Sequence, residues 1–258
     1  MTIMNLFKRL AQVIGALLPF AGLLSGPAAA IVGPSSDGSM VAPHIVMVLN
    51  RLGNTAGFCS GVVVAQNVVM TAAHCVPSGA DLRIHYPSAD RTPVMLPVIG
   101  IARHPDYHAD AIRTRERSID LALVHLAKPL PDRFTPAVLT QEASTTIGKR
   151  VTIAGYGVTQ EGQGSSSGRL RAADLAARAP LSSVLLWAAD PRRAGTGACT
   201  GDSGGPVFGD DGSSVAGLIL WSAGDGTRQC GSLTQSLWLA PYRTWIDRVL
   251  QAWSTAAK

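Results

Sequence analysis

After residue 30 the chain consists of short apolar runs bounded by glycine, proline and polar residues. Runs of this length with turn signals at both ends are typical of strands in an all-β protein. Between two such runs, Asp210-Asp211-Gly212 has the composition of a hairpin turn. We expect strands at residues 44–49, 61–70, 81–86, 121–125, 150–153 and 215–221.

The end of the chain has a different periodicity, which predicts an α-helix over residues 241–253. Three charged residues interrupt this segment, so it is not a membrane-spanning helix. We expect the helix to pack against the second half of the protein. Its apolar face comprises Trp245, Ile246, Val249, Leu250 and Trp253.

Residues 1–30 have the three-part layout of a secretory signal peptide: Lys8 and Arg9, an apolar run over 10–24, and small residues before position 31. A retained membrane anchor is the alternative, although the run is broken by Pro19 and is short for a bilayer span. We expect a secreted or periplasmic protein with no membrane attachment after cleavage. Removal of the two cations lowers the formal net charge from +5 to +3.

The basic balance of the chain, with a pI of about 9.3, raises the question of a nucleic-acid partner. Three arginines lie between residues 113 and 117, but no aromatic residues are interleaved with them. Such a cluster is typical of a solvated face. We therefore expect no nucleic-acid partner.

The stretch Gly201-Asp202-Ser203-Gly204-Gly205-Pro206 carries the clearest chemical signal. Its glycines allow backbone angles that other residues avoid, and Pro206 stiffens the exit from the turn. Such a turn can point a serine hydroxyl outward while backbone N–H groups converge in front of it. That is the geometry of a nucleophile beside an oxyanion hole.

A serine nucleophile needs a base, and the base needs an orienting group. Thr71-Ala72-Ala73-His74-Cys75 follows the apolar run 62–70 and supplies an imidazole. Asp120 is a single carboxylate among apolar neighbours, where an unpaired charge would be costly. His74, Asp120 and Ser203 are therefore our candidate catalytic residues.

These motifs resemble those of secreted serine proteases of the chymotrypsin and trypsin family. The resemblance covers nearly everything after residue 30, and its His and Ser motifs are the specific ones. It is carried by Ile31-Val32-Gly33, Cys59-Ser60-Gly61, Thr71 to Cys75, Asp120-Leu121-Ala122-Leu123, Gly155-Tyr156-Gly157, the 201–206 stretch and Trp221.

The resemblance implies an all-β fold of two packed six-stranded antiparallel β-barrels with a C-terminal α-helix. Residues 31–258 would form one protease domain. The first barrel would cover about 31–130, the second about 140–240 and the helix about 241–254, with a linker near 126–140. The site would lie in the cleft between the barrels.

By the same resemblance, His74 is the general base, Asp120 its orienting partner and Ser203 the nucleophile. The backbone N–H groups of Gly201 and Ser203 would form the oxyanion hole. The implied substrate is a polypeptide, a protein inhibitor is an implied partner, and the chain would act as a monomer. Neither a cofactor nor a metal is implied.

Four cysteines, all after the leader, fit an oxidising compartment, and the residues alone allow three pairings. The family pattern implies Cys59–Cys75 and Cys199–Cys230. Free buried thiols are the alternative.

Cleavage after Ala30 would make Ile31 the new N-terminus. In the resembled family, the ammonium of such a residue pairs with the aspartate before the serine, here Asp202. A buried carboxylate without a partner is expensive, so the pair would order the oxyanion hole. We hypothesise that signal cleavage itself yields the active N-terminus; cleavage elsewhere or a separate trimming step is the alternative.

The resemblance places Gly197 and Ala198 at the floor of the specificity pocket, with Gly231 and a Leu220-Trp221-Ser222 wall. No charge lies at this floor, which favours uncharged, apolar substrate side chains over Arg or Lys. Ser222 replaces a common glycine, and the long spacing from Trp221 to Cys230 leaves open whether Asp225 or Arg228 reaches the pocket. The choice between small and aromatic side chains stays open.

Two other functions compete with a protease. A catalytically silent, protease-like binding module is one, although such proteins usually replace a triad residue, and none is replaced here. An esterase is the other, because the same acyl chemistry hydrolyses esters.

Overall fold

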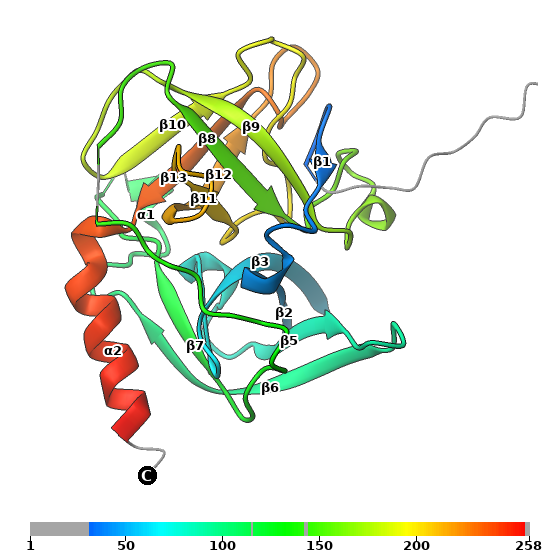
Figure 1. Cartoon of the computed structure of the whole chain (residues 1–258), viewed down its shortest axis with the longest axis vertical. Coiled ribbons are helices and arrows are strands. Elements are labelled where there is room, and N and C mark those ends of the chain that lie inside the picture. The colour runs from blue at the N-terminus through cyan, green and yellow to red at the C-terminus, as the bar shows by residue number, and fades with distance from the viewer. Residues whose placement is uncertain (1–30, 115, 142–143, 256–258) are drawn as a thin grey trace, which may run out of the picture.

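In a computed structural model, the chain forms two antiparallel β-barrels and a C-terminal helix (Figure 1). The structure describes residues 31–114, 116–141 and 144–255. The predicted leader, residues 1–30, lies outside the described residues.

The first barrel has alternating strands whose inward side chains form an apolar core. In β5, for example, Leu82, Ile84 and Tyr86 point inward while their neighbours are more exposed. The strands close in the order β2-β3-β4-β7-β6-β5. They are β2 (Ile45–Leu52), β3 (Thr55–Ala65), β4 (Val68–Thr71), β5 (Asp81–Pro87), β6 (Pro93–Arg103) and β7 (Ala122–Leu126).

The second barrel closes in the order β9-β10-β13-β12-β11-β8, with β8 pairing back to β9. The two-residue strand β1 (Ser36–Asp37) adds to β9. The expected fold of two six-stranded barrels is therefore confirmed. The strands are β8 (Arg150–Gly155), β9 (Arg171–Arg178), β10 (Leu185–Ala189), β11 (Pro206–Phe208), β12 (Val215–Ala223) and β13 (Leu233–Trp238).

The expected strand 61–70 is wrong as one element. Its apolar residues belong to β3 and β4, two antiparallel strands joined by a turn at Gln66-Asn67. The other five expected strands, and the turn between β11 and β12, correspond to observed elements. Strand β6 was not expected because it contains prolines, which are rare inside sheets; a register shift between Val98 and Gly100 follows Pro97.

The C-terminal helix α2 (Arg243–Thr255) follows a 3-10 turn, η4 (Ala240–Tyr242). The expectation that it packs on the second barrel is wrong, because both halves of the helix contact residues of the first: the Trp245 ring lies 5.1 Å from the ring of His104, which follows β6. Figure 1 shows α2 beside β7 of the first barrel, and the Trp253 ring stacks on His125 of β7 with centroids 5.0 Å apart. Among the described helices, none has the length and apolar character needed to cross a lipid bilayer.

Four further short helices lie among the described residues. They are single turns within loops rather than layers of the fold. They are η2 (Ala73–Cys75), α1 (Ala111–Thr114) and η3 (Gly164–Ser166), with η1 (Ala42–His44) leading into β2.

Candidate active site

Two adjacent strands bring His74 and Asp120 together. Thr71 ends β4 and pairs with Ala122, which begins β7. His74 lies on η2, shortly after β4, and Asp120 comes just before β7. Both side chains therefore project from the same end of one antiparallel strand pair, 46 residues apart in sequence.

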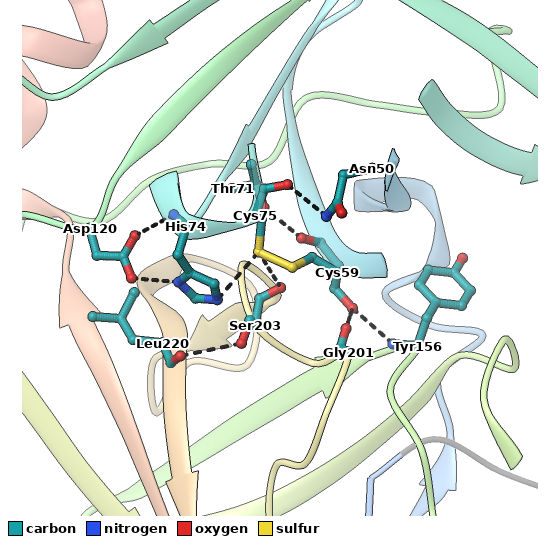
Figure 2. Close-up of a disulfide and its surroundings, with 11 residues drawn as sticks. Asn50, Cys59, Thr71, His74, Cys75, Asp120, Tyr156, Gly201, Ser203 and Leu220 are labelled. Carbon is teal, nitrogen blue, oxygen red and sulfur yellow. Dashed lines mark hydrogen bonds and ion pairs between the residues drawn. A yellow bond between two sulfur atoms is a disulfide. The ribbon is translucent and has the colours of Figure 1, made fainter. Parts of the chain in front are cut away.

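The Asp120 carboxylate binds His74 at two points. Oδ2 lies 2.6 Å from His74 Nδ1, and Oδ1 accepts the His74 backbone N–H at 2.9 Å. This double contact fixes the ring and favours the proton on Nδ1, which leaves Nε2 as the acceptor. Figure 2 shows both bonds, with Nε2 directed toward the Cys75 and Ser203 side of the site.

Ser203 lies in a loop with two positions whose backbone angles favour glycine. Gly201 has φ +93° and Gly204 has φ +77°, both in the left-handed region. A Cβ on Gly201 would overlap the Phe58 ring, and one on Gly204 would overlap Thr71 Oγ1. The glycines are thus required by conformation and by close packing together.

Hydrogen bonds to carbonyls orient the N–H groups of this loop. Val158 N donates to Thr200 O at 2.8 Å, and Gly205 N donates to Asp202 O at 2.9 Å. Thr200 O shares a peptide with the Gly201 N–H, and Asp202 O shares one with the Ser203 N–H. Because C=O and N–H point in opposite directions in a trans peptide, each of these N–H groups points away from the hydrogen bond that its carbonyl accepts. Within the described residues, neither of these N–H groups donates to another group.

His74 and Ser203 line one cavity of about 440 Å³. The Ser203 hydroxyl, however, donates to Leu220 O at 3.2 Å, and the described hydrogen bonds include none between Ser203 and His74 (Figure 2). Nucleophile–base hydrogen bonds are often loose or unmade without substrate.

Both cysteine pairings implied by the resemblance are confirmed. Cys59–Cys75 joins β3 to the turn that carries His74, and Cys199–Cys230 joins the Ser203 loop to the segment before β13. The sulfurs of Cys59 and Cys75 lie near the His74 ring, but a disulfide leaves no thiolate to ligate a metal there.

Asp202 is completely buried and does not line the cavity. It accepts N–H hydrogen bonds from Gly157 at 2.8 Å and Cys199 at 2.9 Å, and no ion pair to it occurs in the described part of the chain. Burial raises the pKa of Asp202 to about 7, against the effect of these two hydrogen bonds. The Ile31 side chain is also fully buried, in the apolar core of the second barrel.

The six residues expected to bind substrate separate into two groups. Leu220, Trp221 and Ser222 line the cavity. Gly197, Ala198 and Gly231 do not line it and are buried. A Cβ on Gly197 would lie 2.8 Å from Gly231 O, so these backbones meet where a pocket floor was expected.

Several lining residues were not found from the sequence. Asp225 and Arg228 form an ion pair with each other and do not line the cavity, whereas Gln229 does. The Gln229 N–H donates to Glu161 Oε2 at 2.8 Å, which brings a carboxylate from the 160–169 loop to the cavity. No sequence motif marks Gln229 and Glu161, because the segment between Trp221 and Cys230 differs in length from the family pattern. The other missed lining residues are Asn50, Gly57, Phe58 and Thr200.

Comparison with known proteins agrees with this arrangement. The trypsin family model matches residues 31–246. The chain is 30% identical over 235 residues to a vitellin-degrading protease of Bombyx mori, covering 84% of each protein, and 31% identical over 209 residues to trypsin 5G1 of Aedes aegypti, covering 74% of this chain and 75% of that protein.

Among solved structures, mouse neuropsin, a serine protease expressed in the limbic system of the brain, has a similar fold. The TM-score is 0.62 at 23% identity, with 79% of this chain and 93% of neuropsin covered. The barrels, the site geometry and the family match together lead to one assignment. The chain belongs to the trypsin family and is a serine endopeptidase.

Proposed function

We propose that this protein cleaves polypeptides through a triad in which Ser203 is the nucleophile, His74 the general base and Asp120 its orienting partner. The observation that carries the proposal is the double contact between Asp120 and His74, at 2.6 and 2.9 Å, beside a cavity that Ser203 also lines. This contact leaves His74 Nε2 free to accept a proton inside the cavity.

The reaction needs the Ser203 hydroxyl to turn from Leu220 O toward His74. As Oγ attacks the substrate carbonyl carbon, its proton passes to Nε2 and the carbonyl oxygen becomes an oxyanion. The protonated imidazole then gives that proton to the leaving amine as the peptide bond breaks. Water repeats the sequence on the acyl-enzyme and releases the acid.

The oxyanion hole consists of the Gly201 and Ser203 N–H groups. Each points away from the carbonyl of its own peptide, Thr200 O or Asp202 O, which already accepts a hydrogen bond. Neither N–H group donates a hydrogen bond within the described chain. Donors held in place before reaction stabilise the developing charge without reorganisation, which is why such holes contribute strongly to rate.

The preferred substrate residue before the cut bond is uncharged and apolar. Gly197 carries no acid to pair with a basic side chain, and the close approach of Gly197 to Gly231 argues against a deep pocket at this position. The disulfide Cys199–Cys230 lines the cavity instead. This favours small side chains, and a peptide-library digest dominated by cleavage after Arg or Lys would contradict it.

The active form begins at Ile31, after secretion and removal of residues 1–30. The buried Asp202 carboxylate lacks a cation among the described residues, and the Ile31 side chain is buried in the adjoining core. A free Ile31 ammonium would supply the missing charge. Sequencing the N-terminus of the secreted protein tests this, because any other first residue contradicts it.

Labelling with a fluorophosphonate, a reagent that phosphonylates activated serines, tests the triad. We expect rapid labelling of the wild type and none of Ser203→Ala. The rival is a catalytically silent binding module, which is consistent with the Ser203–Leu220 hydrogen bond. An unlabelled wild type would favour that rival.

A further inference from the structure

Ser60 is a completely buried polar residue of β3, in the first barrel, and it meets the catalytic loop of the second barrel. Its backbone N–H donates to Ser203 O at 2.9 Å. Its hydroxyl donates to Gly201 O at 3.0 Å. One residue therefore binds the carbonyls on both sides of the Asp202-Ser203 peptide.

Ser60 also accepts hydrogen bonds from two other residues. Tyr156 N donates to Ser60 Oγ at 2.9 Å, and Thr71 Oγ1 donates to Ser60 O at 2.8 Å. Figure 2 shows the Tyr156 nitrogen and the Gly201 carbonyl on the same side of the Cys59–Cys75 disulfide. The hydroxyl thus links the segment after β8 to the loop that carries the nucleophile.

The Ser60 side chain is closely packed. A Cβ on Gly155 would lie 3.0 Å from Ser60 Oγ, and one on Gly205 would lie 3.2 Å from Ser60 Cβ. Without the hydroxyl, the partly buried Tyr156 N and the buried Gly201 O would lose these partners, which is unfavourable. Gly201 has the backbone freedom of a glycine. Its carbonyl belongs to the Gly201-Asp202 peptide, which is held on one side by Asp202 N, donating to Cys199 O at 3.0 Å, and on the other by the Ser60 hydroxyl.

We infer that Ser60 is a positioning residue whose hydroxyl holds Gly201 in the conformation that aims its N–H at the oxyanion. The inference rests on the proposed function of this site. Gly201 carries both the carbonyl that Ser60 binds and the N–H of the oxyanion hole. The hydroxyl acts through this backbone and does not touch the substrate.

The test compares Ser60→Ala with Ser166→Ala in the chain that begins at Ile31. Ser166 is a matched control, because its hydroxyl is also buried and hydrogen-bonded but lies in η3 and does not line the cavity. Thermal midpoints, kcat and KM on a peptide substrate, and binding of a peptide boronate are measured. The boronate forms a tetrahedral adduct on the serine and places an oxygen in the hole.

We expect Ser60→Ala to lower kcat by about ten- to a hundredfold while KM changes less than about twofold, because a small misplacement of an oxyanion donor has this scale of effect. Boronate affinity should fall with kcat. Ser166→Ala should leave kcat and boronate affinity unchanged. Equal kcat in the two variants would overturn the role of Ser60.

Ser60→Gly gives the same comparison if Ser60→Ala does not fold, since it keeps both backbone bonds to Ser203 and Thr71. Failure of both Ser60 variants to fold would also contradict the inference, because we expect a stability loss close to that of Ser166→Ala. A wild type that fluorophosphonate does not label at Ser203 would instead refute the proposed function. The two failures are therefore distinguishable.

Discussion

The two barrels contribute to the cavity in different ways. The first supplies side chains, His74 and Asp120, from the ends of paired strands and joined by direct contacts. The second supplies a loop, residues 199–205, whose main-chain atoms form the proposed oxyanion hole. The His–Asp half is complete within its own barrel, whereas the loop depends on partners elsewhere.

The two halves should therefore respond differently to substitutions. A pair of side chains on strands is lost by changing one functional group, with little effect on the backbone. A loop of unusual backbone angles is sensitive to anything that alters its supports, including Ser60 and the buried Asp202. The expected outcomes below run from the largest effect to the smallest.

Asp120→Asn tests the His–Asp half. The asparagine amide has one acceptor oxygen where the carboxylate has two. If that oxygen keeps the His74 backbone N–H, the NH₂ group faces Nδ1 and favours the tautomer with the proton on Nε2, which cannot act as a base. We expect kcat to fall by about 10⁴-fold with little change in thermal midpoint. The control is Asp106→Asn, an exposed aspartate on the neighbouring loop, which should leave kcat unchanged. A similar loss in both variants would contradict the assignment.

The buried Asp202 should make stability depend on pH when residues 28–30 are kept ahead of Ile31. Its raised pKa means that the folded state holds a proton that the unfolded state has lost. Stability should therefore fall by about 4 kcal/mol as pH rises from about 4 to about 7, and then stay level. Urea unfolding at several pH values measures this.

Two comparisons sharpen that measurement. In a chain that starts at Ile31, the ammonium should favour the carboxylate and remove the decline. In the longer chain, Asp202→Asn should also remove it. A decline that persists in Asp202→Asn would assign the titration to another group.

Each half contains one disulfide, so removing one or the other compares their contributions to stability. Replacing either pair by serine should cost about 3 kcal/mol of unfolding free energy. The loss should be about 0.6 kcal/mol larger for Cys199–Cys230, whose sequence separation is 31 against 16 for Cys59–Cys75. Urea unfolding of both double variants measures the order, and the opposite order would contradict the loop-closure explanation.

Gly197→Ala tests whether the pocket floor is closed by backbone. The new Cβ would lie 2.8 Å from Gly231 O, so we expect a loss of about 1–3 kcal/mol in urea unfolding. Gly164→Ala is the control, because no atom lies within 4 Å of a Cβ there. Full stability of Gly197→Ala would indicate an open floor.

The sequence predicted the barrels and the candidate triad, because short motifs around His74, Asp120 and Ser203 have few other uses. It did not predict the close approach of Gly197 to Gly231, because the spacing from Trp221 to Cys230 departs from the family pattern. Nor did it indicate Ser60, since its partners are main-chain atoms that carry no residue signature. The helix face containing Trp253 was predicted correctly, but periodicity does not identify the surface it meets.

The most direct test of cooperation between the two halves is the rate of fluorophosphonate labelling at Ser203 in His74→Ala, with the labelled peptide identified by mass spectrometry. The serine and its loop remain in this variant, and only the base from the other barrel is removed. We expect Ser203 to be the labelled residue in the wild type and its labelling in the variant to be at least about 10³-fold slower. Equal labelling rates would contradict the account, because Ser203 would then react without a base from the first barrel.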